Sequence, residues 1–403
     1  MADDPVLARV EELSGTFMTG QLTRRQFGKG LLALGLSLPA VSLIVAACSK
    51  AASLSPTTPT ASGASSVLEP AEAALLSAAK GEGTLYLTGI PPEWANYQGQ
   101  FDLWDKLTGI KRDGITTEGE FTSGQELDSI KNTKKPDVGD VGITFGSQAK
   151  TAGLVQNYKH AHWDDVDAKL KDPDGAWCME YYGTEAFTIN TDAVKLDIKD
   201  WKDLLDPSLK NSVGIDGDPT KASDSFYAVW SAAFANGGGL DDIGPGVDFF
   251  NQLKAAGNLT PTRATEANML SGEVKVGIKW EYLGLANRDK FAGAPNIKVV
   301  IPPSGSVTGP YVAIITATAP HPNAAKLWNE MLFSDAGQLN YLKGYAHPAR
   351  YDALAAAGKI PADLIAKLPS ADAYKTVTTV FDQAKVDAAK AKLGTLWKLV
   401  VNS

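Results

Sequence analysis

The feature that most constrains the fold of this chain is an alternation of short apolar runs with helix-length amphipathic segments. From about residue 68 onward, residues 84–88 predict a strand, residues 94–107 a helix and residues 110–115 a second strand. Because the same order continues along the chain, the sequence is typical of an α/β protein with mostly parallel sheets. A chain of 403 residues exceeds the size of one hydrophobic core, so we expect two domains.

The rest of the chain continues this alternation. Three consecutive glycines at residues 237–239 end one helix, because glycine is costly in a helix interior. A loop is expected over residues 144–147, and the part from residue 353 onward is predicted to be largely helical. Further strands are predicted at residues 137–143, 185–190, 213–215, 274–282, 297–301 and 311–316, and further helices at residues 123–132, 201–205, 223–236, 246–256, 264–270 and 322–333.

The N-terminal part carries targeting signals and is set apart from the fold. Arg24 and Arg25, with Phe27 and Lys29 after them, precede an apolar run and resemble the twin-arginine export motif. The run ends in Val-Ala-Ala-Cys, which resembles a bacterial lipobox with Cys48 as the lipidated residue. The alternative is an uncleaved anchor followed by an accidental cysteine. We therefore predict a signal peptide over residues 1–47 and a Cys48 lipid anchor with a flexible tether over residues 48–67.

Composition and motifs exclude several classes of function. The formal net charge of −8 lacks the basic surface of a nucleic-acid-binding protein, so no nucleic-acid partner is expected. Two cysteines cannot form a disulfide framework, and Cys178 is interpreted as a small buried hydrophobe. The sequence contains no G-x-S-x-G, Walker A or H-E-x-x-H motif. We therefore expect no catalysis, no cofactor and no metal site.

Three stretches of the chain have a familiar order and spacing: residues 201–207, residues 270–282, and residues 324–328 with 334–338. Together they resemble the extracytoplasmic solute-binding proteins of ABC importers, in the subgroup of polyamine, ferric-ion, thiamine and phosphonate binders. The resemblance implies a type II periplasmic-binding-protein-like fold. Each of its two lobes is a mostly parallel sheet flanked by helices, and the ligand cleft lies between the lobes. It also implies lobe boundaries of 68–187 plus 307–350 for lobe one, and 188–306 plus 351–403 for lobe two.

Most candidate ligand-binding residues follow or end predicted strands or begin helices, where the clefts of α/β proteins form, and Tyr182 precedes the first predicted crossover strand. Many of them are aromatic or acidic, which suits an organic cation such as a polyamine. The resemblance to polyamine-binding members places Trp94, Tyr97, Trp280 and Glu281 at similar positions. Phosphonate, thiamine and ferric ion stay open, and the helix start at residues 220–223 would suit an anion. The full set is Trp94, Tyr97, Thr144, Phe145, Ser147, Tyr182, Asp218, Ser223, Trp280, Glu281 and Tyr282.

These observations together predict a lipid-anchored, extracytoplasmic solute-binding protein. We expect a monomer that captures a small molecule and delivers it to an ABC transporter permease, with membrane attachment through Cys48. A secreted cofactor-dependent enzyme is the first alternative, because twin-arginine export carries folded cofactor-containing proteins. A ligand sensor on the same fold is the second alternative.

Overall fold

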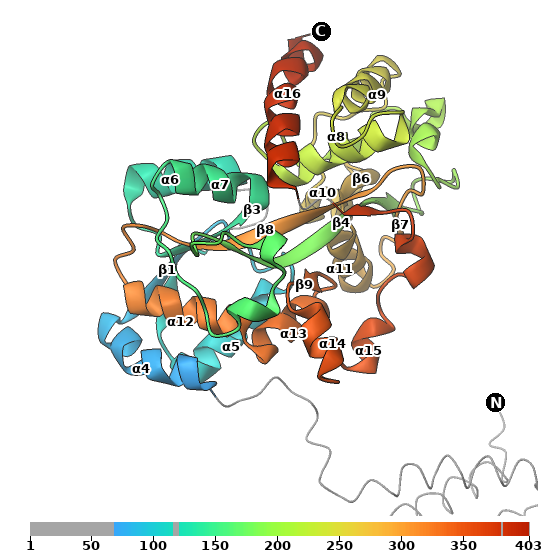
Figure 1. Cartoon of the computed structure of the whole chain (residues 1–403). Helices are drawn as coiled ribbons and strands as arrows, with labels where there is room; N and C mark the ends of the chain where they lie inside the picture. Colours follow the sequence, from blue (N-terminus) through green and yellow to red (C-terminus); the bar gives the residue numbers. More distant parts are fainter. Residues whose placement is uncertain (1–67, 116–120, 380–381, 403) are drawn as a thin grey trace, which may run out of the picture. The chain divides into compact units, whose positions relative to one another are not determined.

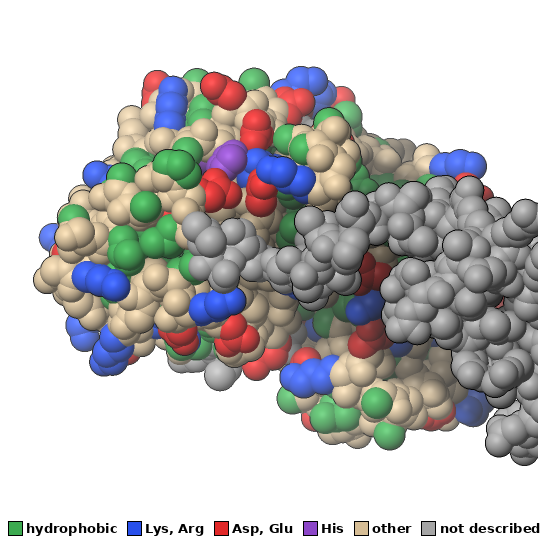
Figure 2. Space-filling view, turned by 90° about the horizontal axis from the view of Figure 1, so that it is seen from below, with side chains coloured by type: hydrophobic (Ala, Val, Ile, Leu, Met, Phe, Trp, Pro, Cys, Tyr) green, Lys and Arg blue, Asp and Glu red, His purple; other side chains and the backbone are tan. Residues whose placement is uncertain are grey.

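The computed structural model describes residues 68–115, 121–379 and 382–402 (Figure 1). The predicted signal peptide, the Cys48 anchor and the tether lie outside these residues. No helix within the described part of the chain combines the length and the apolar character needed to cross a membrane. On the face shown in Figure 2, acidic and basic side chains are interspersed among apolar ones.

The core of the fold is a ten-stranded mixed sheet in which seven strands follow the order β2-β1-β3-β8-β4-β6-β5. Strands β7 and β9 pair with β4, and β10 pairs with β8. The strands are β1 Thr84–Thr88, β2 Lys111–Asp113, β3 Val138–Gly142, β4 Cys178–Asn190, β5 Val213–Ile215, β6 Val276–Trp280, β7 Ile297–Val300, β8 Val307–Ile315, β9 His347–Pro348 and β10 Thr378–Thr379.

Helices cover the sheet and form the C-terminal part (Figure 1). The α-helices are α4 Pro70–Glu82, α5 Tyr97–Thr108, α6 Ser123–Thr133, α7 Ile143–Thr151, α8 Ser223–Ala235, α9 Gly244–Ala255, α10 Glu266–Ser271, α11 Glu281–Phe291, α12 Pro322–Phe333, α13 Asp335–Lys343, α14 Tyr351–Ala356, α15 Ala362–Ile365 and α16 Gln383–Asn402. Short 3-10 helices are η1 Trp163–Asp165, η2 Ala168–Leu170, η3 Trp201–Leu205, η4 Pro207–Leu209 and η5 Ala371–Tyr374.

Two long strands, β4 and β8, join the two halves of the sheet. The first part of β4 pairs with β8, and its second part pairs with β6 and β7. Strand β8 also pairs with β3, so it connects to the half that contains β1 and β2. Among the described strands, every antiparallel pair includes β4 or β8, and the other pairs are parallel. Both strands are almost wholly buried, and β4 carries two glutamates, Glu180 and Glu185, into the interior.

Most predicted elements are confirmed to within a few residues, and β1 and β5 have the predicted bounds. The loop expected over residues 144–147 is wrong, because α7 begins immediately after β3. The strand predicted to reach Tyr282 ends at Trp280, and Glu281 begins α11. A carboxylate in the first turn favours a helix start, because it lies at the positive end of the helix dipole.

The C-terminal part is largely helical, as predicted, and ends in α16. This helix contacts α9 through the Trp397 and Phe250 rings, whose centroids lie 5.7 Å apart. It also contacts α7, where the Lys390 ammonium donates to the Thr144 hydroxyl at 3.1 Å. Because α16 touches helices of both halves, the predicted lobe boundaries, with residues 351–403 in lobe two, stay a prediction.

Candidate functional site

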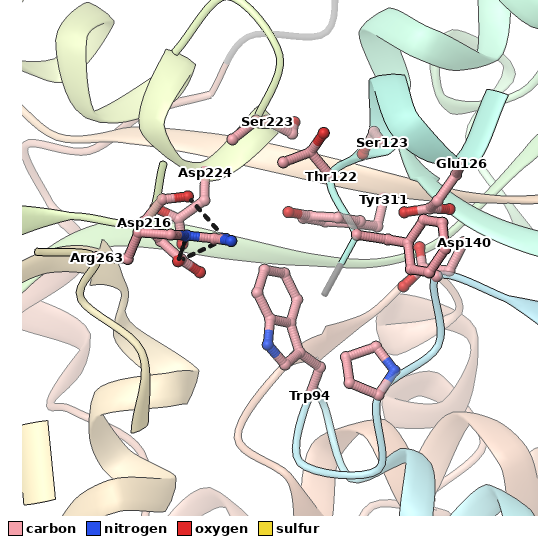
Figure 3. A pocket seen from close by; sticks show the side chains of 14 residues that line it. Trp94, Thr122, Ser123, Glu126, Asp140, Asp216, Ser223, Asp224, Arg263 and Tyr311 are labelled. Carbon is pink, nitrogen blue, oxygen red and sulfur yellow. Dashed lines mark hydrogen bonds and ion pairs between the residues drawn. The ribbon is translucent and has the colours of Figure 1, made fainter. Parts of the chain in front are cut away.

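One pocket lies where the two halves of the sheet meet, and fourteen residues line it (Figure 3). It holds about 490 Å³ of free space, including open solvent at its mouth. The lining comes from the segment after β1, the start of α6, strand β3, the segment after β5, the start of α8, Arg263 and strand β8. The residues are Gly89, Pro91, Trp94, Phe121, Thr122, Ser123, Glu126, Asp140, Asp216, Ala222, Ser223, Asp224, Arg263 and Tyr311.

Local sequence explains why helix starts converge here. Thr122 caps α6 by accepting from the backbone N–H of Gln125, and this bond fixes the first turn, which carries Ser123 and Glu126. Across the pocket, α8 begins at Ser223. Gly142 at the end of β3 leaves the space that the Ser223 hydroxyl fills, since a Cβ atom at position 142 would overlap it. The halves are therefore in contact beside the pocket.

One wall of the pocket is acidic. Glu126 is 4% exposed and Asp140 is 2% exposed. The Tyr181 hydroxyl donates to Asp140 Oδ2 at 2.7 Å, but Asp140 Oδ1 and Glu126 Oε2 have no hydrogen-bond donor. Burial raises the pKa of Glu126 well above its usual value and that of Asp140 to about 7. Gly89, at a φ of +67°, makes room for the Glu126 carboxylate, which any Cβ atom there would overlap.

A second buried carboxylate, Glu180, lies behind Asp140. The Tyr341 hydroxyl donates to Glu180 Oε2 at 2.5 Å and lies 3.5 Å from the hydroxyl of Tyr97. Burial, and then the charge of Asp140, raise the pKa of Glu180 well above its usual value. The acidic wall therefore continues from the pocket into a buried network of carboxylates and tyrosines.

The opposite wall holds the one basic residue among the fourteen lining residues. The Arg263 guanidinium contacts Asp216 Oδ1 through Nη2 at 2.9 Å and through Nε at 3.1 Å (Figure 3). Asp216 is buried, whereas 32% of the Arg263 side chain is exposed, so the pair lies at the pocket wall with only its carboxylate removed from water. The charge of Arg263 is thus balanced within the protein, and the acidic wall lies apart from it.

Two aromatic rings lie between these walls. The ring centroids of Trp94 and Tyr311 are 5.8 Å apart, with an interplanar angle of 75°. Trp280 supports Tyr311 from behind, because its indole N–H donates to the Tyr311 hydroxyl at 3.2 Å. Trp280 itself is fully buried and contributes no surface to the pocket.

Two of the predicted ligand-binding residues, Trp94 and Ser223, line this pocket, and the other nine do not. Thr144 and Phe145 are buried in α7 against Lys390 of α16. Ser147 lies further along α7, where its carbonyl accepts from the Thr151 hydroxyl.

The remaining predicted residues lie in the core or in other segments. Asp218 is exposed and accepts from the backbone N–H of Thr220, so it stabilises a turn. Tyr97, Trp280 and Tyr282 are buried behind the pocket, and the Tyr282 ring packs edge-on to Trp94 with centroids 6.4 Å apart. Tyr182 lies on β4 and Glu281 begins α11, and neither is in the pocket lining.

Sequence reasoning missed most of the polar lining. Asp216 directly follows a predicted strand, and Ser123 and Glu126 begin a predicted helix, so the same rule could have selected them. Asp140 lies inside a strand and Arg263 in a segment without regular structure, and nothing in the pattern distinguishes either one. The missed residues are Gly89, Pro91, Phe121, Thr122, Ser123, Glu126, Asp140, Asp216, Ala222, Asp224, Arg263 and Tyr311.

Solved structures that match this architecture include bacterial binding proteins of the two-lobed type II periplasmic class. AfuA from Actinobacillus pleuropneumoniae, described as a periplasmic binding protein with exogenous fructose-6-phosphate bound, matches with a TM-score of 0.59 and 21% identity over 78% of this chain and 98% of its own. Iron-bound HitA from Pseudomonas aeruginosa matches with a TM-score of 0.59 and 20% identity, over 79% of this chain and 99% of its own. A protein described as a putative spermidine/putrescine ABC transporter, from Listeria monocytogenes, matches with a TM-score of 0.58 and 15% identity, over 79% of this chain and 98% of its own. These likenesses define the fold.

The sequence itself defines the family. The model of the family described as "Bacterial extracellular solute-binding protein" matches residues 133–376, which is more than half of the chain, and the protein belongs to this family. An uncharacterized protein of Haemophilus influenzae is 30% identical over 254 residues, covering 58% of this chain and 69% of that protein. The predicted family and fold class are confirmed. Within the described residues, no cluster of three His, Cys, Asp or Glu side chains is arranged to hold a metal ion.

Proposed function

We propose that this extracytoplasmic solute-binding protein takes an organic cation, such as a protonated amine or a polyamine, in the pocket of Trp94 and Tyr311. Membership of the family makes it a solute-binding protein of an ABC transporter, acting outside the cytoplasm. We propose that Cys48 anchors it by lipid and that it works without catalysis. The family and its structural neighbours are binding proteins, which supports the second point.

The proposal rests on two acidic side chains of the pocket whose carboxyl groups each have an oxygen without a hydrogen-bond donor. Glu126 and Asp140 are buried with oxygens that no donor reaches, whereas Arg263 is held by Asp216. A buried carboxylate without a partner is costly, so a solute that brings an ammonium group gains by supplying the missing donors. The Trp94 and Tyr311 faces would each add about 0.5–2 kcal/mol for a desolvated cation.

Calorimetry with the purified mature protein tests this proposal. The solutes are putrescine, spermidine, thiamine, a phosphonate and ferric citrate. A polyamine is expected to bind, and Glu126→Gln and Trp94→Ala should each weaken its binding by about 1–3 kcal/mol. Asp218→Asn is the matched control, because this carboxylate is exposed and lies outside the pocket. Equal effects of Glu126→Gln and Asp218→Asn would contradict the proposal.

An anionic solute is the second candidate, since the starts of α6 and α8 both reach the pocket. Ser123 accepts from the backbone N–H of Gly142 at 3.1 Å, while the buried Ser223 hydroxyl has no hydrogen-bond partner. A helix N-terminus with such a hydroxyl suits a phosphate or carboxylate. In the same calorimetry, tight binding of the phosphonate alone, unaffected by Glu126→Gln and weakened by Ser223→Ala, would favour this candidate.

A further inference from the structure

A second pocket lies beneath the C-terminal segment and shares no lining residue with the first. It holds about 880 Å³ of free space, including open solvent at its mouth. Its floor is formed by β4 and β8, one side by β9 and the start of α14, and its roof by the segment from α15 to β10. The lining residues are Tyr182, Thr184, Thr308, His347, Tyr351, Ile365, Leu368, Pro369, Ala371, Tyr374, Val377 and Thr379.

The two pockets lie on opposite faces of the strands that join the halves of the sheet. Successive side chains of a strand point to opposite faces. On β4, Tyr181 reaches Asp140 at the first pocket, while Tyr182 and Thr184 line the second. On β8, Tyr311 lines the first pocket and Thr308 the second. A molecule in the second pocket would therefore be separated from the solute by the sheet.

Aromatic rings form one side of the second pocket. The rings of Tyr182 and His347 are stacked, with centroids 4.8 Å apart and an interplanar angle of 10°. Tyr374 packs edge-on to His347 at 5.3 Å, and its buried hydroxyl has no hydrogen-bond partner. The faces and edges of these rings can surround a small cation on several sides.

A negative charge lies directly behind these rings. Glu281 is 0% exposed; its Oε2 accepts from the backbone N–H of Thr184, and its Oε1 has no hydrogen-bond donor, with His347 Nε2 at 3.4 Å. Burial, followed by the charge of Glu281, raises the pKa of Tyr182 to about 12 and raises that of Tyr374 as well. None of the twelve lining residues is Lys, Arg, Asp or Glu, and behind them Glu281 lies close enough to the fully buried Glu185 to interact with it electrostatically.

We propose that this second pocket is a binding site for a small organic ammonium ion with an apolar body. The ammonium group lies against the rings of Tyr182 and Tyr374, in the field of the Glu281 carboxylate. The hydroxyls of Thr184 and Thr308, which have no partners, accept hydrogen bonds from it. Side chains of the roof, such as Leu368, cover the apolar body and remove it from water.

Benzylamine is the probe, because it is an ammonium ion on an apolar ring. Calorimetry with the mature protein should give a Kd of about 1 mM, as expected for a ligand of this size. Leu368→Trp, which fills the pocket, and Tyr374→Ala, which removes a ring, should each weaken binding at least about tenfold. Benzoate, with the same ring and the opposite charge, should also bind at least about tenfold more weakly. Asp218→Asn, at an exposed residue outside both pockets, is the matched control and should leave benzylamine binding unchanged.

A crystal of the unmodified protein soaked with 4-bromobenzylamine gives a readout that needs no variant. An anomalous peak from bromine between Tyr182, Tyr374 and Leu368 would support the site. A peak beside Trp94 alone, or none, would overturn it. The proposal also fails if benzoate binds as well as benzylamine, if Trp94→Ala abolishes binding, or if folded Leu368→Trp and Tyr374→Ala proteins bind as tightly as the parent. Failure here would leave the calorimetric test of the first pocket unaffected.

Discussion

The affinity for a cationic solute should depend on pH through Asp140. Burial raises the pKa of this carboxyl from 3.8 to about 7, while the hydrogen bond from the Tyr181 hydroxyl acts in the opposite direction. Below this pKa the side chain is protonated and offers no charge to a cation. Its ionised fraction rises from roughly one tenth at about pH 6 to roughly nine tenths at about pH 8. We therefore expect polyamine affinity to rise roughly tenfold over this interval, if the cation binds the ionised form alone.

The contribution of Asp140 to the stability of the unliganded protein should fall as pH rises, whereas the affinity for the cation rises. The pKa of Asp140 is raised in the folded state, so between about pH 4 and about pH 7 the unfolded state has lost a proton that the folded state still holds. The contribution of Asp140 to the free energy of unfolding is therefore complete below about pH 4 and is lost as pH rises towards about 7. A bound cation favours the ionised form and should offset this loss.

The assay is calorimetric titration with spermidine at several pH values, together with thermal melts with and without spermidine. Asp140→Asn should lower the affinity at about pH 8 and flatten the profile between about pH 6 and about pH 8. No histidine is among the fourteen lining residues, so histidine titration within the pocket does not complicate the comparison. A parent profile that is flat, or one that Asp140→Asn leaves unchanged, would refute this reasoning.

Three further predictions concern the anchor, the C-terminal helix and the closure of the pocket. Cys48→Ala should leave the protein unprocessed or free of lipid; recovery of this variant in the detergent phase with an acylated N-terminus would contradict the lipobox. Burial lowers the pKa of Lys390 to about 7, so the unfolded state binds the extra proton between about pH 7 and about pH 10, and stability should rise with pH there. Lys390→Met should remove that rise in pH-dependent melts, and an unchanged slope would contradict the assignment. A saturating solute should shrink the radius of gyration in small-angle scattering, because two-lobed binders close on their ligands; no compaction would count against the hinge.

The predicted fold agrees with the structure where glycines mark the ends of a strand or helix. The strand at residues 84–88 lies between glycines, and the helix at residues 223–236 ends at three glycines, so their limits follow from local chemistry. Helices α7 and α11 were missed because each begins at the residue after a strand, with no turn residue between them. A buried apolar strand and a buried helix have the same composition, so periodicity does not separate them.

The site was harder to predict because the residues that define it depend on which face of a strand points inward. Tyr181 and Tyr182 are identical in chemistry and adjacent in sequence, yet one supports the acidic wall of the first pocket and the other lines the second. Glu281 was selected as a cleft residue because a charge after an apolar strand needs an explanation. The structure gives that carboxylate a buried place behind Tyr182 and His347, on the face of β4 away from Trp94. The aromatic and acidic residues that the sequence singled out therefore lie around two different pockets. Because successive side chains of a strand point to opposite faces, neighbouring residues of one strand lie at different pockets.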